Sequence, residues 1–93
     1  MNLLPVRSEG RVHFEMPAES GSQVFVAGTF NDWNQTANSL KDNPGSGRFK
    51  TVLRIPAGRH EYKFIVDGVW LEDPKCPNSV PNAYGSMNSV LHV

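Results

Sequence analysis

The sequence has few features typical of secreted or membrane proteins. It contains one cysteine, Cys76, among 93 residues, so a disulfide within the chain is excluded and the thiol is expected to be inert. It has no run of about 20 apolar residues, the length that a membrane-spanning helix needs. Residues 1–10 lack the basic start and apolar stretch of a signal peptide. We therefore expect a cytoplasmic protein with no membrane partner.

An excess of charge of one sign is absent as well. The 9 basic residues balance the 9 acidic ones, and the basic residues are scattered along the chain. Nucleic-acid binding needs a basic patch or stripe, so the composition predicts no nucleic-acid partner. The 3 histidines and the cysteine show no metal-ligand spacing, and no phosphate-binding or catalytic-triad motif is present. No metal and no cofactor are therefore expected.

Turn-forming residues, by contrast, are frequent. Most of the 8 glycines and 7 prolines lie between short apolar runs, a spacing typical of an all-β sandwich or barrel. The length favours one domain. We predict a lead-in segment at residues 1–10 and a β-domain over residues 11–93.

Alternating apolar side chains predict the individual strands. Two strands at residues 62–66 and 69–71 are joined by the tight-turn dipeptide Asp67-Gly68, which favours a hairpin. Residues 73–84 are rich in Pro and Asn and are expected to form an ordered loop. The other predicted strands cover residues 12–16, 23–28, near 39–41, 48–55 and 86–93. About seven antiparallel strands of this kind predict an immunoglobulin-like sandwich.

Both tryptophans fall in or beside polar turns. Trp33 lies in the segment GTFNDWN, and Trp70 follows the predicted hairpin turn. Alternation predicts that Val69 and Leu71 fill the core while Trp70 stays outside. An exposed indole near amide and ammonium groups suits a sugar ring, whose hydroxyls those groups can bind. From the residues alone, a protein-binding patch and plain core packing of both tryptophans stay open as alternatives.

Glycoside hydrolysis would need two carboxyl groups roughly 5 to 10 Å apart across a cleft. Four acidic residues lie close in sequence to the tryptophans. Two of them are in turns, where Asp caps its own backbone, and a third precedes a proline. A sandwich of this size also has little room for a deep cleft, so we predict a non-catalytic domain. The four carboxylates considered are Asp32, Asp67, Glu72 and Asp73.

Three segments of the sequence resemble carbohydrate-binding module family 48. They are VFVAGTFNDWN at residues 24–34, the turn at 56–58 leading into HEYKFIVDGVWLEDP, and YGSMNSVLHV at 84–93. The family includes the glycogen-binding domain of the AMP-activated protein kinase β subunit, and the N-terminal β-domains of glycogen branching and debranching enzymes and isoamylases. The resemblance covers residues 11–93. It implies an early-set, immunoglobulin-like sandwich that binds α-1,4-linked glucans such as glycogen, starch and maltooligosaccharides.

The resemblance also implies the site residues. Trp33 and Trp70 match the stacking platform of the family, and Lys63 and Asn88 match the groups that hydrogen-bond sugar hydroxyls. Tyr84 stands where the kinase domain has a leucine that threads a cyclic glucan, and a tyrosine could stack on a sugar instead. Weaker candidates are Ser86 and Asn31.

Alternation gives Lys63 an outward position, because it faces away from Tyr62 and Phe64. Any catalytic activity is then expected in a fused or associated enzyme, such as a family 13 glycoside hydrolase or transferase. The alternative function is a regulatory or scaffolding β-domain that binds a glucan-metabolising enzyme.

Overall fold

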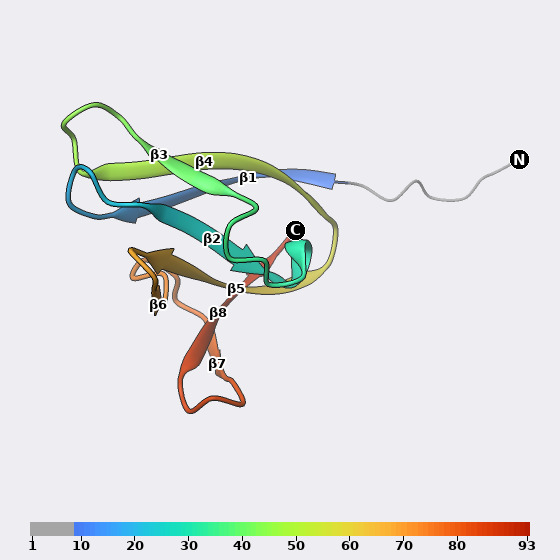
Figure 1. Cartoon of the computed structure of the whole chain (residues 1–93). Coiled ribbons are helices and arrows are strands. Elements are labelled where there is room, and N and C mark those ends of the chain that lie inside the picture. The colour runs from blue at the N-terminus through green and yellow to red at the C-terminus, as the bar shows by residue number, and fades with distance from the viewer. Residues whose placement is uncertain (1–8) are drawn as a thin grey trace, which may run out of the picture.

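A computed structural model of the chain describes residues 9–93 (Figure 1). Glu9 and Gly10 belong to the first strand, and the rest of the predicted lead-in lies outside the described residues. No helix of the described part is long and apolar enough to cross a membrane. The elements in chain order are β1 (Glu9–Pro17), β2 (Val24–Gly28), the 3₁₀ turn η1 (Thr29–Asn31), β3 (Ser39–Asp42), β4 (Arg48–Pro56), β5 (Arg59–Val66), β6 (Val69–Leu71), β7 (Ser79–Pro81) and β8 (Met87–His92).

All strand pairs are antiparallel, in the order β1-β4-β3-β2-β5-β8-β7, and β6 pairs with β5. The short strand β3 connects two layers, because Leu40 pairs with Val24 of β2 while Lys41 pairs with Lys50 of β4. Figure 1 shows β1 and β4 in one layer above β2 and β5 in the other. The predicted all-β, antiparallel sandwich is confirmed.

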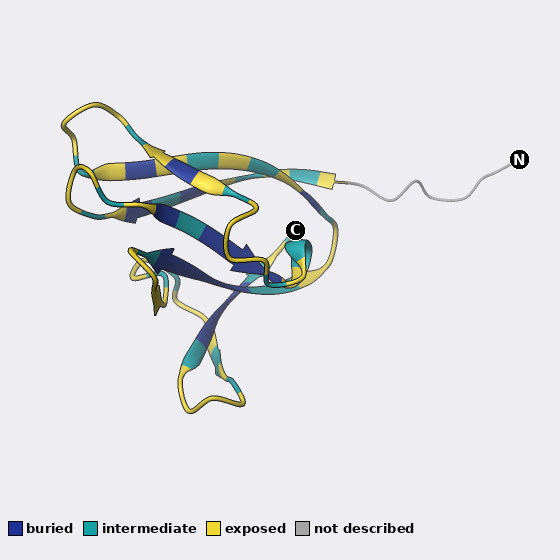
Figure 2. Cartoon of the chain, in the orientation of Figure 1, coloured by how far each residue is buried: buried dark blue, intermediate teal, exposed yellow. Residues whose placement is uncertain are grey.

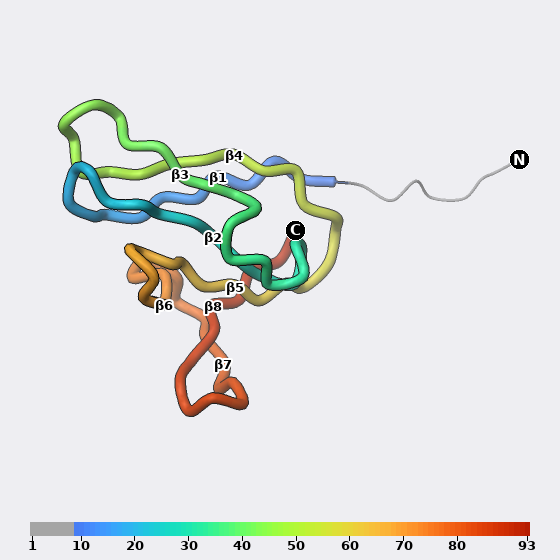
Figure 3. The backbone as a smooth tube through the Cα atoms, in the orientation of Figure 1, coloured from blue at the N-terminus to red at the C-terminus, as the bar shows by residue number. Residues whose placement is uncertain are grey.

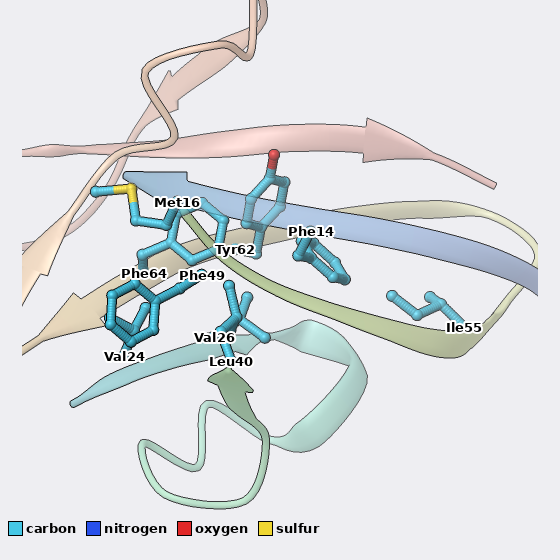
Figure 4. Packing of buried hydrophobic residues seen from close by; sticks show 9 residues of the cluster. All are labelled: Phe14, Met16, Val24, Val26, Leu40, Phe49, Ile55, Tyr62 and Phe64. Atoms are coloured by element: carbon cyan, nitrogen blue, oxygen red, sulfur yellow. The ribbon is translucent and has the colours of Figure 1, made fainter. Parts of the chain in front are cut away.

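The core fills the space between these layers (Figure 4). Phe14 of β1 meets Tyr62 and Phe64 of β5 edge to face, with ring centroids 5.2 and 6.2 Å apart. This geometry suits aromatic rings, because the positive edge of one ring faces the negative face of the other. The buried apolar cluster contains Phe14, Met16, Val24, Val26, Leu40, Phe49, Ile55, Tyr62 and Phe64.

The hairpin of β5 and β6 turns at the predicted dipeptide. Asp67 has φ 50° and Gly68 has φ 86°, as two-residue hairpin turns of this type require. The Asp67 carboxylate does not cap its own backbone, because Oδ1 accepts a hydrogen bond of 2.9 Å from the Gln23 N–H. The turn is thereby tied to the start of β2.

The prediction that Val69 and Leu71 fill the core is wrong. Their exposed fractions are 56% and 38%, neither below the 37% of Trp70. The reason is that β6 is a three-residue edge strand whose residues are all exposed (Figure 2). Alternation separates two faces of a strand, but it cannot tell whether another layer covers either of them.

One strand inside the segment predicted as loop was missed. β7 pairs with β8 through Ser79–Ser89, Val80–Asn88 and Pro81–Met87. Proline is tolerated there because β7 lies at the edge of the sheet, where a missing N–H donor leaves no ladder partner unpaired. The pair extends away from the body of the domain (Figure 3).

Gly28 at the end of β2 leaves no space for a side chain. A Cβ there would collide with the Glu61 carbonyl oxygen and lie 2.7 Å from Phe30 Cε2 and 2.9 Å from Tyr62 Cβ. We expect Gly28→Ala to lower the free energy of unfolding by about 1–3 kcal/mol, because backbone and ring must shift. Urea unfolding measures the loss, and an unchanged midpoint would show that β2 and β5 are farther apart than described.

Candidate binding site

An open pocket of about 830 Å³ lies beside β5, β6 and the loop between β7 and β8. Aromatic rings and polar side chains line it together. All five sequence-predicted residues line this pocket, although each comes from a different strand, turn or loop: Trp33, Lys63, Trp70, Tyr84 and Asn88. The full lining is Thr29, Trp33, Glu61, Lys63, Trp70, Asn82, Ala83, Tyr84, Ser86 and Asn88.

The two indoles lie against each other at one side of the pocket. Their ring centroids are 6.5 Å apart and the ring planes are inclined by 42°. Trp70 comes from β6. Trp33 comes from the turn after η1, where its backbone N–H donates a hydrogen bond of 2.9 Å to the Gly28 carbonyl. Asp32 and Trp33 both have left-handed backbone, with φ of 55° and 57°. For a bulky residue such as Trp this conformation is strained, and strain of this kind concentrates at binding sites.

Lys63 lies on the face of β5 opposite Tyr62 and Phe64, as predicted, but it is not exposed. Its exposed fraction is 7%, and its side chain reaches the loop between β7 and β8. The Lys63 ammonium donates a hydrogen bond of 2.9 Å to Ser86 Oγ. The outward position expected from alternation is therefore corrected to a buried one at the pocket floor.

A chain of hydrogen bonds runs along this floor. Asn82 Nδ2 donates to Ser86 Oγ at 2.8 Å and to Asn88 Oδ1 at 2.9 Å. Asn88 Nδ2 donates to Glu61 Oε1 at 3.0 Å. The chain thus links the Lys63 ammonium at one end to the Glu61 carboxylate at the other. Such networks hold side chains in one orientation when every member is satisfied.

Glu61 is the one acidic residue among those that line the pocket. The Asn88 hydrogen bond, followed by that of Arg59 at 2.9 Å, holds the pKa of Glu61 below its usual value of 4.5. Glu61 is therefore ionised at neutral pH and acts as a hydrogen-bond acceptor. The four carboxylates considered for catalysis do not line the pocket. One of them, Asp73, accepts a hydrogen bond of 2.6 Å from the Tyr62 hydroxyl.

Three polar lining residues, Thr29, Glu61 and Asn82, were missed in the sequence. Glu61 could have been found, since it lies two residues before Lys63 and shares its face of the strand. Asn82 could not, because its role depends on the pairing of β7 with β8. Asn31, a weaker candidate, does not line the pocket. Its side-chain oxygen accepts a hydrogen bond from the Gly28 N–H, and its Nδ2 donates to Val26 O and Asn38 Oδ1.

Fold and site together define a small antiparallel β-domain with an open, aromatic-walled pocket. Concave sites with a few convergent polar groups are where proteins typically bind ligands. The family model described as the glycogen recognition site of AMP-activated protein kinase matches residues 11–93. The chain belongs to this family.

Curated relatives are kinase subunits that are longer than this chain. The 5'-AMP-activated protein kinase subunit beta-2 of Mus musculus is 38% identical over 76 residues, which cover 82% of this chain and 27% of the mouse protein. The beta-1 subunit of Sus scrofa is 36% identical over 73 residues, covering 78% of this chain and 56% of the relative. That of Bos taurus is 37% identical over 73 residues, with coverage of 78% and 25%. The chain therefore corresponds to a part of each of these relatives.

Proposed function

We propose that this domain binds α-1,4-linked glucans, such as glycogen, starch and maltooligosaccharides, without catalysing a reaction on them. The observation that carries the proposal is the inclined pair of indoles, Trp33 and Trp70, beside a partly buried hydrogen-bond network in one open pocket. Membership of a family described by glycogen recognition supports the same ligand class.

The pocket offers what a glucan chain needs. The apolar face of a glucose ring stacks on an indole, while Lys63 and Asn88 hydrogen-bond its hydroxyls. Tyr84 is 93% exposed at the rim and extends the aromatic surface for a further ring. A few stacked rings on an open surface should give roughly −4 to −8 kcal/mol, or about millimolar to micromolar affinity.

The domain serves a larger assembly in this proposal. The relatives are named as kinase subunits, so we place the domain in a cytoplasmic kinase complex or beside a glucan-metabolising enzyme such as a family 13 glycoside hydrolase. We also propose that its sandwich belongs to the immunoglobulin-like early set, as the resemblance to carbohydrate-binding module family 48 implies. The domain then supplies glucan binding and its partner supplies catalysis.

Exposed apolar side chains do not favour the alternative of a protein-interaction module. Val69, Trp70 and Leu71 lie together on β6 beside the pocket, and Tyr84 lies at its rim. Val52 on β4 is the remaining large exposed apolar residue of the described part, with an exposed fraction of 44%. One isolated valine is ordinary for a protein surface and does not mark an interface.

A tryptophan-fluorescence titration tests the proposal. Maltoheptaose should produce a saturable change with a dissociation constant in about the millimolar to micromolar range, because both tryptophans line the pocket. A β-linked cello-oligosaccharide serves as the control and should produce no saturable change. The absence of any change with maltoheptaose in a folded sample would refute glucan binding.

A further inference from the structure

Asn82 is the first residue of the loop that connects β7 to β8. Its Oδ1 atom accepts hydrogen bonds from the backbone N–H of Tyr84 at 2.9 Å and of Ser86 at 3.2 Å. A backbone N–H can only donate, so the atom that faces these two groups must be the amide oxygen. The loop backbone therefore fixes which way the Asn82 amide points.

With the oxygen turned to the loop, Asn82 Nδ2 faces β8. It donates to Ser86 Oγ at 2.8 Å and to Asn88 Oδ1 at 2.9 Å. An asparagine side chain has two donor hydrogens and two acceptor lone pairs. All four are used inside the protein, so Asn82 has no hydrogen-bonding capacity left for a ligand, although it lines the pocket.

Asn88 is oriented from two sides. Its oxygen accepts from Asn82, and its Nδ2 donates to the Glu61 carboxylate, which Arg59 holds in place at 2.9 Å. An ionised carboxylate can only accept, so both neighbours require the same orientation of the Asn88 amide. One N–H and one lone pair of that amide are left over for a ligand. A ligand that uses both groups must therefore accept one hydrogen bond from Asn88 and donate one to it, as two sugar hydroxyls can.

Ser86 is constrained in a different way. Its oxygen accepts from Lys63 Nζ at 2.9 Å and from Asn82 Nδ2, which uses both of its lone pairs. Within residues 9–93 its hydroxyl hydrogen has no acceptor among the hydrogen bonds of the structure. Ser86 can then only donate to a ligand, and a sugar oxygen beside it must accept.

We infer that Asn82 is a positioning residue of the glucan site, which sets the direction of the hydrogen bonds that Asn88 and Ser86 offer to the sugar. The inference rests on the proposed glucan binding and adds a residue that acts without hydrogen-bonding the ligand. The donor pattern suits neighbouring hydroxyls of one glucose unit, each of which can accept one hydrogen bond and donate another.

The substitution Asn82→Asp tests the role of the side-chain nitrogen separately from that of the oxygen. It keeps an oxygen for the Tyr84 and Ser86 N–H groups, so the loop stays closed, but it replaces Nδ2 by an oxygen that faces Asn88 Oδ1. Maltoheptaose affinity, measured by calorimetric titration, should fall about tenfold or more, while the thermal unfolding midpoint changes little. Asn82→Ser is the second variant: a serine hydroxyl can cap the loop but is too short to reach Asn88, so the same loss is expected.

A double-mutant cycle with Asn88→Ala distinguishes positioning from a general effect on structure. If Asn82 acts mainly through Asn88, Asn82→Asp should cost about threefold or less in the Asn88→Ala background, with the remainder acting through Ser86. The same tenfold cost in both backgrounds, or unchanged affinity of the single variant, would overturn the inference while glucan binding stands. No maltoheptaose binding by the unmodified chain would instead refute the proposed function, and the inference with it.

Discussion

Trp70→Ala should remove most maltoheptaose binding and leave the domain folded. Trp70 lies on the edge strand β6 with 37% of its surface exposed, so its removal opens no cavity in the core. It forms one half of the aromatic wall, and truncating an aromatic anchor of a binding site typically costs about 2 kcal/mol or more, which is roughly thirtyfold in affinity. Calorimetric titration and the thermal unfolding midpoint of the same sample measure both quantities.

Val69→Ala provides the matched control for this prediction. Val69 precedes Trp70 on the same strand, is 56% exposed and does not line the pocket. Its truncation should leave affinity within about twofold, since surface substitutions away from special features rarely exceed about 0.5 kcal/mol. If Trp70→Ala unfolds the domain instead, Trp70 belongs to the core and the stacking assignment is wrong.

Phe64→Ala should cause the largest loss of stability in the domain, about 3–5 kcal/mol. Phe64 is fully buried at 0% exposure and packs edge to face against Phe14 and Tyr62. A small domain has a free energy of unfolding of only about 5–15 kcal/mol, so this loss would leave a marginal fold. Urea unfolding followed by circular dichroism measures the change.

The site should be weakened together with the fold in this variant, because Phe64 adjoins Lys63 on β5. Val52→Ala is the control: Val52 is 44% exposed on β4 and should contribute less than about 1 kcal/mol. A Phe64→Ala protein with nearly unchanged stability would contradict the two-layer core between β1 and β5.

The main strands could be predicted because their burial follows a local pattern. In β1 and β4 every second residue faces the core, and a period of two survives in the sequence. The turn at Asp67-Gly68 was equally visible, since few dipeptides tolerate two left-handed residues in succession. β7 was not, because a three-residue strand ending in proline carries no alternation of its own. It exists because β8 is there to pair with it.

The aromatic part of the pocket could be predicted from the sequence, but only some of its polar residues could. The tryptophans and Lys63 stand in motifs that mark them individually. Glu61 was within reach of prediction, since it shares a strand face with Lys63. Asn82 matters through its partners on β8 and in the loop before it, and no local pattern reports such distances. The exposure of Val69 and the burial of Lys63 were misjudged for the same reason: both depend on which distant segment covers a strand face. The roles of these residues in binding stay predictions.

The left-handed backbone at Trp33 has a consequence for the history of the chain. A glycine or asparagine would hold φ 57° with less strain, which typically costs about 1–3 kcal/mol for a bulky residue. The backbone at this turn therefore gives no reason for a tryptophan, and what the residue contributes comes from its indole, which lies against Trp70 and lines the pocket. In a related domain whose pocket no longer binds a ligand, glycine or asparagine at this position would relieve the backbone strain. The absence of this tryptophan would then be an early sign that the pocket had lost its binding role.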